Sequence, residues 1–199
     1  MQKKLTAGRK NLLIMAGTLL LLLAACGVHQ CKNFFMDFFI DDSRYDAEIT
    51  AAANAHGLPA PLVKALIRQE SKFNADAVGK RGEIGLMQLL PAGSAAEWAR
   101  INHRPVPSRR QLADVHTNLN IGCWYLARAV KKWSGYRHGT ELALAQYNAG
   151  EKNAIRWKPT TPDGEVIPRI TWPGTRRYVS NIMQNYLRES VNQKKSALP

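Results

Sequence analysis

The chain has 199 residues, of which 45% are hydrophobic and 22% are charged. This composition excludes an intrinsically disordered protein, and the length allows one domain of ordinary size with extensions. The formal net charge of +13 favours an anionic partner such as nucleic acid, a membrane or an acidic polymer, the alternative being that it only keeps the protein soluble.

The first 25 residues are predicted to be a secretory signal peptide. Residues 1–11 carry four basic side chains and no acidic one, and Leu12 to Ala25 form an apolar run of 14 residues. Because a membrane-spanning helix needs about 20 apolar residues, this run is too short to span a bilayer comfortably. A basic segment followed by a short apolar one is typical of export signals.

The apolar run ends in Leu23-Ala24-Ala25-Cys26, which resembles the lipobox that is cleaved before a lipidated cysteine. We therefore expect a lipoprotein whose acyl chains on Cys26, palmitate among them, hold it on a membrane, since more than one chain gives stable anchoring. An ordinary signal peptide or an uncleaved anchor is the alternative. The next residue is Gly27 rather than Asp, which by resemblance to Gram-negative lipoproteins favours the periplasmic face of the outer membrane.

Residues 26–42 form the next predicted segment, a lipidated tether with an apolar extension. Phe34 to Ile40 is unusually apolar for a linker. We expect it to pack on the domain that follows, the alternative being that it lies on the bilayer surface. The globular domain is predicted to span residues 43–192, before a polar, frayed tail at residues 193–199.

The domain is predicted to open with two helices. Ser43 and Asp46 resemble a capping box that begins a helix running up to Gly57, which can end it in a left-handed C-cap. Pro59 and Pro61 then favour a second helix, because proline is tolerated in the first helical turn.

Further helices follow from apolar spacing, and no stretch shows sustained strand alternation or an internal repeat. The segment 151–173 holds four of the ten prolines and is predicted to be a loop. The fold class is therefore mostly α, a domain of several short helices. The remaining helices are predicted at residues 86–101, 114–134, 139–148 and 174–190.

Two cysteines follow Cys26. Cys31 falls in the tether, and Cys123 falls on an apolar face of a predicted helix. A disulfide between them is one alternative in an oxidising compartment, but we expect Cys123 to be a buried free thiol. The histidines show no metal-ligand spacing, so no metal and no cofactor are predicted. These histidines are His29, His56, His103, His116 and His138.

Glu70 is the first residue to suggest chemistry. It continues, at helical spacing, an apolar stripe on the second predicted helix. A carboxyl group on the buried face near a helix C-terminus is expected to have a raised pKa, because burial and the helix dipole both disfavour its anion. Such an acid can protonate a glycosidic oxygen; on spacing alone, the alternative is an internal Glu paired with a Lys or Arg. The stripe consists of Leu62, Val63, Leu66 and Ile67.

Four short motifs occur in order along the domain, namely Glu70-Ser71, Gly85-Leu86-Met87-Gln88-Leu89-Leu90-Pro91, Ala145-Gln146-Tyr147-Asn148-Ala149-Gly150 and Thr175-Arg176-Arg177-Tyr178-Val179. With the segment from Asp114 to Leu126, their order and spacing resemble the soluble lytic transglycosylase (SLT) family, glycoside hydrolase family 23, over roughly residues 45–190. The resemblance implies a lysozyme-like domain of several short helices around a substrate groove.

The resemblance also implies roles for individual residues. Glu70 would be the catalytic acid and then the base, with the Tyr178 hydroxyl near it. For Met87 the alternative is an ordinary core residue, and for Tyr147 a packed aromatic whose hydroxyl merely finds a partner. The residues that would bind or flank the substrate are Gln88, Met87, Tyr147, Asn148 and Tyr178.

The activity that the resemblance implies is peptidoglycan lytic transglycosylation. Ordinary glycosidases use two carboxylates, but the motifs contain only Glu70, and Asp76 and Glu83 are expected to be solvated charges in a Gly-rich loop. One carboxyl suffices if the muramoyl 6-hydroxyl attacks its own anomeric carbon, which leaves a 1,6-anhydromuramoyl end without hydrolysis. The alternatives are a hydrolytic lysozyme-type muramidase on the same fold, a catalytically weak wall-binding scaffold and a chitinase-like enzyme.

The expected partners are the glycan strands of peptidoglycan and a membrane reached through Cys26. Loss of the four basic signal residues lowers the net charge from +13 to +9, which still suits the carboxylates of peptidoglycan. Export argues against a nucleic acid partner, and we expect a monomer.

Two positions depart from the family's pattern. Gly79 stands nine residues after Glu70, where the family often has Ser, so a hydroxyl expected beside the acid is missing. Gly174 stands before Thr-Arg-x-Tyr, where the family often has Glu, which removes a side chain expected to contact the stem peptide.

Overall fold

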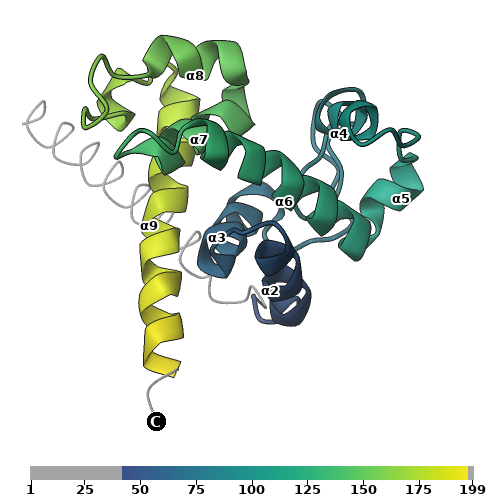
Figure 1. Ribbon diagram of the computed structural model, residues 1–199. Coiled ribbons are helices and arrows are strands. Elements are labelled where there is room, and N and C mark those ends of the chain that lie inside the picture. The colour runs from purple at the N-terminus through teal and green to yellow at the C-terminus, as the bar shows by residue number, and fades with distance from the viewer. Residues whose placement is uncertain (1–41, 197–199) are drawn as a thin grey trace, which may run out of the picture. The chain divides into compact units, whose positions relative to one another are not determined.

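The computed structural model describes residues 42–196, without the side chains of residues 194 and 196. Helices make up most of this part of the chain (Figure 1). No strand forms within those residues, where two isolated bridges join Val78 to Ile84 and Ile84 to Leu89. The mostly α fold class is thus confirmed. The elements are α2 (Asp46–Ala55), α3 (Ala60–Ser71), the π-helical segment η1 (Pro91–Ala95), α4 (Ala96–Ile101), α5 (Arg109–Ala113), α6 (Val115–Lys132), α7 (Gly139–Ala149), α8 (Glu151–Trp157), the short 3-10 helix η2 (Ile167–Arg169) and α9 (Pro173–Ser196).

Some predictions concern residues outside the described range, so they stay predictions. They are the signal peptide at 1–25, the lipidation of Cys26, the position of Cys31, the packing of Phe34 to Ile40, and the state of residues 197–199.

The first helix begins later than its expected capping box. α2 starts at Asp46, whose backbone N–H donates to the Ser43 carbonyl at 3.1 Å, and Tyr45 rather than Ser43 is the N-cap residue. The Asp46 carboxylate lies 2.8 Å from the Lys64 ammonium, so it pairs with α3 instead of capping its own helix. The C-cap prediction is confirmed, since Gly57 has a φ of +65°.

Helix α3 carries the predicted apolar stripe into the core. Its four stripe residues are at most 2% exposed. Helix α3 packs against α9, which runs alongside α3 and past α7 in Figure 1. Burial of each such side chain contributes about 1.5–3 kcal/mol, so the stripe holds α3 at a fixed rotation about its axis. The last turn of the helix is therefore held in a defined orientation.

The helix predicted at 86–101 is wrong in its first half. Residues 86–90 form a tight turn in which Ile84 and Leu89 exchange two backbone hydrogen bonds of 3.0 and 2.9 Å. Gly85 and Gln88 have φ values of +78° and +48°, which an α-helix does not allow. The buried side chains of this segment mimic helical periodicity, but a π-helical turn and then α4 begin only at Pro91.

The loop predicted at 151–173 is also wrong in part. It contains α8 and η2. All four prolines of the segment lie after α8, so they limit where the helix ends but do not prevent it. Gly150, with a φ of +83°, separates α7 from α8 and lets the chain turn between them.

The remaining helices lie close to the predicted ranges. α6 spans Val115–Lys132 and begins with Asp114, whose carboxylate accepts from the Thr117 N–H at 2.9 Å. Cys123 on this helix is fully buried and free, and burial raises the pKa of its thiol to about 12, so it is chemically inert. α9 continues to Ser196, so the predicted frayed tail is helical up to that residue.

Candidate active site

A cleft of about 570 Å³ opens beside the C-terminal end of α3. The end of α3, the 79–90 turn region, η1, α6 and α7 all contribute to its walls. The polar residues that carry the argument below are Glu70, Glu83, Gln88, Tyr147 and Asn148, and Gly79 lies among them. Four of the sequence-predicted site residues therefore meet in one cavity, although they come from three separate segments of the chain.

Glu70 lies in the last turn of α3, and α3 ends one residue later. Lys72 and Phe73 follow in the left-handed region, with φ values of 52° and 64°, which turns the chain sharply away from the helix axis. The position leaves Glu70 partly buried at the wall of the cleft, near the negative end of the helix dipole.

The pKa of Glu70 is raised from 4.5 to about 7. Burial of the carboxyl is the main cause, because it disfavours the charged form. A hydrogen bond from Tyr178 opposes this, the negative charge of Glu83 adds to it, and the positive charge of Arg81 opposes it. A substantial fraction of the Glu70 side chains therefore keeps its proton at neutral pH, as a general acid requires.

Tyr178 reaches Glu70 from α9. Its hydroxyl donates a hydrogen bond of 2.6 Å to Glu70 Oε1. Burial raises the pKa of this phenol well above its usual value, and the Glu70 carboxylate raises it further. Tyr178 thus stays neutral and acts as a fixed hydrogen-bond donor to Glu70.

Tyr147 and Asn148, at the end of α7, line the same cleft. The Tyr147 hydroxyl donates to the backbone carbonyl of Met87 at 2.8 Å, and burial raises the pKa of this phenol too. Asn148 Oδ1 accepts a hydrogen bond of 2.7 Å from the Thr175 hydroxyl of α9. The Asn148 amide nitrogen can then serve as a donor toward the cleft.

Gln88 and Met87 point in different directions from the same turn. Gln88 lines the cleft, and its amide nitrogen donates to the Ala77 and Gly85 carbonyls at 3.1 and 3.0 Å. Met87 is fully buried, and its sulfur packs where a Cβ on Gly122 would lie. The Met87 side chain therefore belongs to the core and does not line the cleft. Its backbone carbonyl accepts the hydrogen bond from Tyr147.

Asn118 holds this turn and was given no role by the sequence reasoning. Its side chain accepts from the Met87 N–H at 2.8 Å and donates to the carbonyls of Ile84 and Leu112 at 2.9 and 2.7 Å. A buried amide with three such bonds fixes the backbone around it. The sequence signal that could have identified it is a polar residue on the otherwise apolar, buried face of α6.

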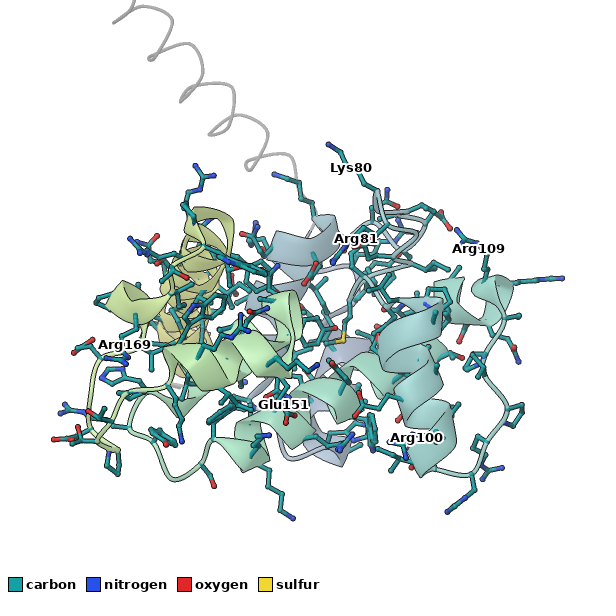
Figure 2. The ribbon with its side chains drawn as sticks, turned by 90° about the horizontal axis from the view of Figure 1, so that it is seen from above. Lys80, Arg81, Arg100, Arg109, Glu151 and Arg169 are labelled. Atoms are coloured by element: carbon teal, nitrogen blue, oxygen red, sulfur yellow. The ribbon has the colours of Figure 1, made fainter. Side chains whose placement is uncertain are left out.

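Glu83 is the site residue that sequence reasoning placed wrongly. Its side chain is only 13% exposed and lines the cleft, whereas a solvated loop charge was expected. The Arg81 backbone N–H donates to Glu83 Oε2 at 2.9 Å, and Arg81 Nε donates to Oε1 at 2.7 Å. Lys80, on the same loop, also lines the cleft, and Figure 2 shows its side chain extending outward from the domain.

The family model of the transglycosylase SLT domain matches residues 48–167. The chain belongs to this family. This chain is 30% identical over 122 residues to "Membrane-bound lytic murein transglycosylase E" of Buchnera aphidicola. The match covers 54% of this chain and 55% of the relative. The chain is 31% identical over 132 residues to "Soluble lytic murein transglycosylase" of Escherichia coli, covering 63% of this chain and 20% of that protein.

Solved structures give the same family. An inactive mutant of the lytic transglycosylase Slt from Pseudomonas aeruginosa superimposes with a TM-score of 0.68 at 30% identity. The superposition covers 82% of this chain and 26% of that one. The SLT domain chain thus spans about half the length, or less, of these relatives.

The two departures from the SLT pattern have different structural settings. A Cβ on Gly79 would lie 2.7 Å from Gln88 Oε1 and closer still to Glu83 Oε2, so both polar side chains occupy the space that a serine would need. Gly174, in the first turn of α9, has no atom within 4 Å of such a Cβ. It lines a second, more open cavity of about 490 Å³ together with Tyr178 and Asn148. The Gly79 position is thus filled by other groups, whereas the Gly174 position is open.

No group of three or more His, Cys, Asp or Glu side chains in residues 42–196 is placed to hold a metal ion. None of the helices in the same range has the length and apolarity needed to cross a bilayer.

Proposed function

We propose that this chain is a peptidoglycan lytic transglycosylase that cleaves the bond between N-acetylmuramic acid and N-acetylglucosamine. The observation that carries the proposal is the mostly buried Glu70 carboxyl at the wall of a polar cleft, hydrogen-bonded to the Tyr178 hydroxyl and with a raised pKa. Membership of the SLT domain family and relatives named lytic murein transglycosylases support it.

In the first step, Glu70 acts as a general acid. Its proton passes to the glycosidic oxygen as the bond from the muramoyl anomeric carbon breaks, so the leaving sugar departs as a neutral alcohol. A carboxyl with a pKa of about 7 still holds its proton in a large fraction of molecules at neutral pH, whereas an ordinary Glu does not.

In the second step, the Glu70 carboxylate acts as a base. It takes the proton of the muramoyl 6-hydroxyl, whose oxygen attacks the anomeric carbon of the same sugar, and a 1,6-anhydro bond forms. The acid is restored, and no water is consumed. Because the nucleophile belongs to the substrate, no second protein carboxylate has to deliver it. The hydrogen bond from Tyr178 stabilises the carboxylate between the two steps.

The remaining polar groups of the cleft would bind the sugars. Gln88, Tyr147 and Asn148 offer amide and hydroxyl groups to the sugar hydroxyls and N-acetyl groups. Lys80 and Arg81 at the cleft would attract the carboxylates of the lactyl groups and stem peptides. We further propose a monomer, exported and held in the cell envelope through lipid on Cys26, in agreement with the membrane-bound relatives.

Product analysis on purified sacculi tests the proposal. The wild-type protein is expected to release muropeptides with 1,6-anhydromuramoyl ends and to create no new reducing ends. New reducing ends would instead identify a hydrolytic muramidase, and cleavage of chitin oligomers but not of sacculi would identify a chitinase-like enzyme. The Glu70→Gln protein is the control, since it keeps the shape of the side chain and loses the acid. If wild type releases no more muropeptide than this variant while both bind sacculi, the chain is a binding scaffold.

A further inference from the structure

Glu83 occupies a position that its loop alone does not explain. Its carboxylate lies inside the cleft rather than on the outer surface, with 13% of the side chain exposed. Gly79 makes room for it, because any Cβ at that residue would collide with Glu83 Oε2. The same loop exposes 69% of the Arg81 side chain, so a carboxylate paired with Arg81 could equally have been solvated.

The position brings a negative charge close to the carboxyl of Glu70. The Glu83 charge acts on the buried Glu70 carboxyl and raises its pKa, which means that the two carboxylates repel each other. Among the described residues, the hydrogen bonds to the Glu83 carboxylate come from Arg81, two positions away, and from the backbone of Glu83 itself. The carboxylate therefore ties no separate element into the fold. A charged side chain that lines the cleft and ties no separate element into the fold is a candidate for a functional role.

The environments of the two carboxyls drive them into opposite protonation states. Burial raises the pKa of Glu83, but hydrogen bonds from its own backbone and from Arg81 outweigh that effect, and its pKa lies below the ordinary value. Glu70, in contrast, holds its proton up to about pH 7. One cleft therefore contains a carboxyl whose surroundings favour the acid form and a carboxyl whose surroundings favour the charged form, the arrangement that separates acid from charge stabiliser in glycosidases.

We propose that Glu83 is a second functional carboxylate of the cleft, whose negative charge stabilises the positively charged sugar ring that forms when the glycosidic bond breaks. The transition state of glycoside cleavage resembles an oxocarbenium ion. A fixed anion in a partly water-excluded cleft favours that state over the neutral substrate. This inference rests on the proposed function, because it names a further group that acts in the same reaction.

The contacts of Glu83 favour a charge-stabilising role over that of a base. Oε2 accepts from the Arg81 N–H and Oε1 from Arg81 Nε, so both oxygens are already engaged. Proton affinity is reduced by such bonds, whereas the charge is retained. A water molecule would find a weak base here, but a cationic sugar would still find an anion. Glu70 therefore remains the only group that moves a proton.

Glu83→Gln tests the proposal, because glutamine keeps the shape and removes the charge. Release of anhydro-ended muropeptides at saturating sacculi is expected to fall on the order of 100-fold, with little change in the half-saturating concentration. Glu83→Asp, which keeps a carboxylate, should recover part of that loss. Asp76→Asn is the matched control, since it removes the same charge from an exposed position of the same loop outside the cleft.

A pH profile separates this role from a structural one. The charged and titratable groups that act on Glu70 are Tyr178 from α9, together with Glu83 and Arg81 from the loop; Tyr147 of α7 also faces it. Because the Glu83 charge raises the pKa of Glu70, Glu83→Gln should move the alkaline limb of the rate profile to lower pH. A variant that merely loosened the loop would lower the rate without moving that limb.

Two outcomes would overturn the proposal. They are a Glu83→Gln rate equal to that of Asp76→Asn, and an alkaline limb that does not move. Both are measured with a preparation whose wild type forms anhydro ends and whose Glu70→Gln variant does not. Failure of Glu83 is therefore distinguishable from failure of the proposed function.

Discussion

The Tyr178 hydroxyl donates a 2.6 Å hydrogen bond to Oε1 of Glu70, and these two residues lie 108 positions apart in the chain. The bond joins the last turn of α3 to α9 at the wall of the cleft. It opposes the effect of burial on Glu70, because it stabilises the charged form of a carboxyl whose surroundings favour the neutral form. Glu70 is thereby poised between its acid and base states.

Removal of this bond should unbalance the two states. In Tyr178→Phe the pKa of Glu70 is expected to rise, because a hydrogen bond that lowers it is lost. The alkaline limb of the rate profile should therefore move to higher pH, the opposite direction from Glu83→Gln. A hydrogen bond to a charged group contributes about 1.5–3 kcal/mol, so the plateau rate should fall about 10- to 100-fold. Rates of anhydro-muropeptide release measured across pH check both expectations.

Tyr186→Phe on the same helix is the control for this variant, because it removes a phenol hydroxyl at a position that lines none of the described cavities. It should keep the wild-type profile. If both variants behave alike, Tyr178 does not act through Glu70.

Glu70 should make the protein less stable as pH rises. Its pKa is about 7 in the folded state and near 4.5 when exposed, so between these values the folded state binds the proton more strongly than the unfolded state does. The contribution of Glu70 to the free energy of unfolding is then greatest below pH 4.5 and declines until about pH 7. The total decline from this single group is at most roughly 3 kcal/mol. Glu70→Gln lacks this decline, so it should unfold at higher denaturant concentration than wild type at pH 8.

Urea unfolding of both proteins at pH 5 and pH 8 measures this difference. The gap in the free energy of unfolding between variant and wild type should widen toward pH 8. An equal gap at both pH values would show that Glu70 titrates normally, which would remove the physical basis for its role as an acid.

Restoration of the family's serine at Gly79 should damage this protein. The new Cβ would displace the Glu83 carboxylate and the Gln88 amide oxygen, both ends of flexible side chains that can move. The fold should therefore survive, while the displaced Glu83 loses its bonds to Arg81. We expect the Gly79→Ser rate to fall as far as that of Glu83→Gln.

A double-mutant cycle checks this explanation. If Gly79→Ser acts mainly by displacing Glu83, its effect should be much smaller in a Glu83→Ala background, where only the displacement of Gln88 remains. Gly135→Ser is the control, since no atom lies within 4 Å of its Cβ. Independent, additive losses would contradict a shared mechanism.

The sequence predicted Glu70 well because its position depends on local regularity. Helical spacing from Leu66 and Ile67 fixes the face on which Glu70 lies, and the packing of α3 then fixes where that face points. Glu83 depends instead on a turn that is closed by the bonds between Ile84 and Leu89 and on the missing side chain of Gly79. Neither condition has a periodic signal, so a charge in a Gly-rich loop was interpreted as solvated.

The same distinction explains the errors in the helices. Leu86, Met87 and Leu89 are all fully buried, and their pattern is compatible with a helix. Their backbone is set by Gly85 at φ +78° and by the buried amide of Asn118, a contact across more than 30 residues. Tertiary hydrogen bonds override the local helix propensity here. The spacing of apolar residues in the sequence carries no information about such bonds.

Asn118 should therefore be a strong determinant of both stability and activity. Asn118→Ala leaves the Met87 N–H and two carbonyls without their buried partner. Each unsatisfied buried group costs about 1–3 kcal/mol, part of which water or relaxation recovers, so we expect a loss of about 2–4 kcal/mol in urea unfolding. The turn that carries Gln88 should also loosen, so the half-saturating concentration of sacculi should rise under conditions where the variant is still folded.

Asn120→Ala is the matched control for that experiment, two residues along α6 on an exposed position. Its side-chain oxygen Oδ1 forms a single exposed hydrogen bond of 2.8 Å with His56 Nε2. This bond contributes little to stability because water can replace it. Asn120→Ala should therefore change stability by less than about 0.5 kcal/mol. If Asn118→Ala were equally mild, the turn would be held by its own backbone bonds, and the position of Gln88 would not depend on α6.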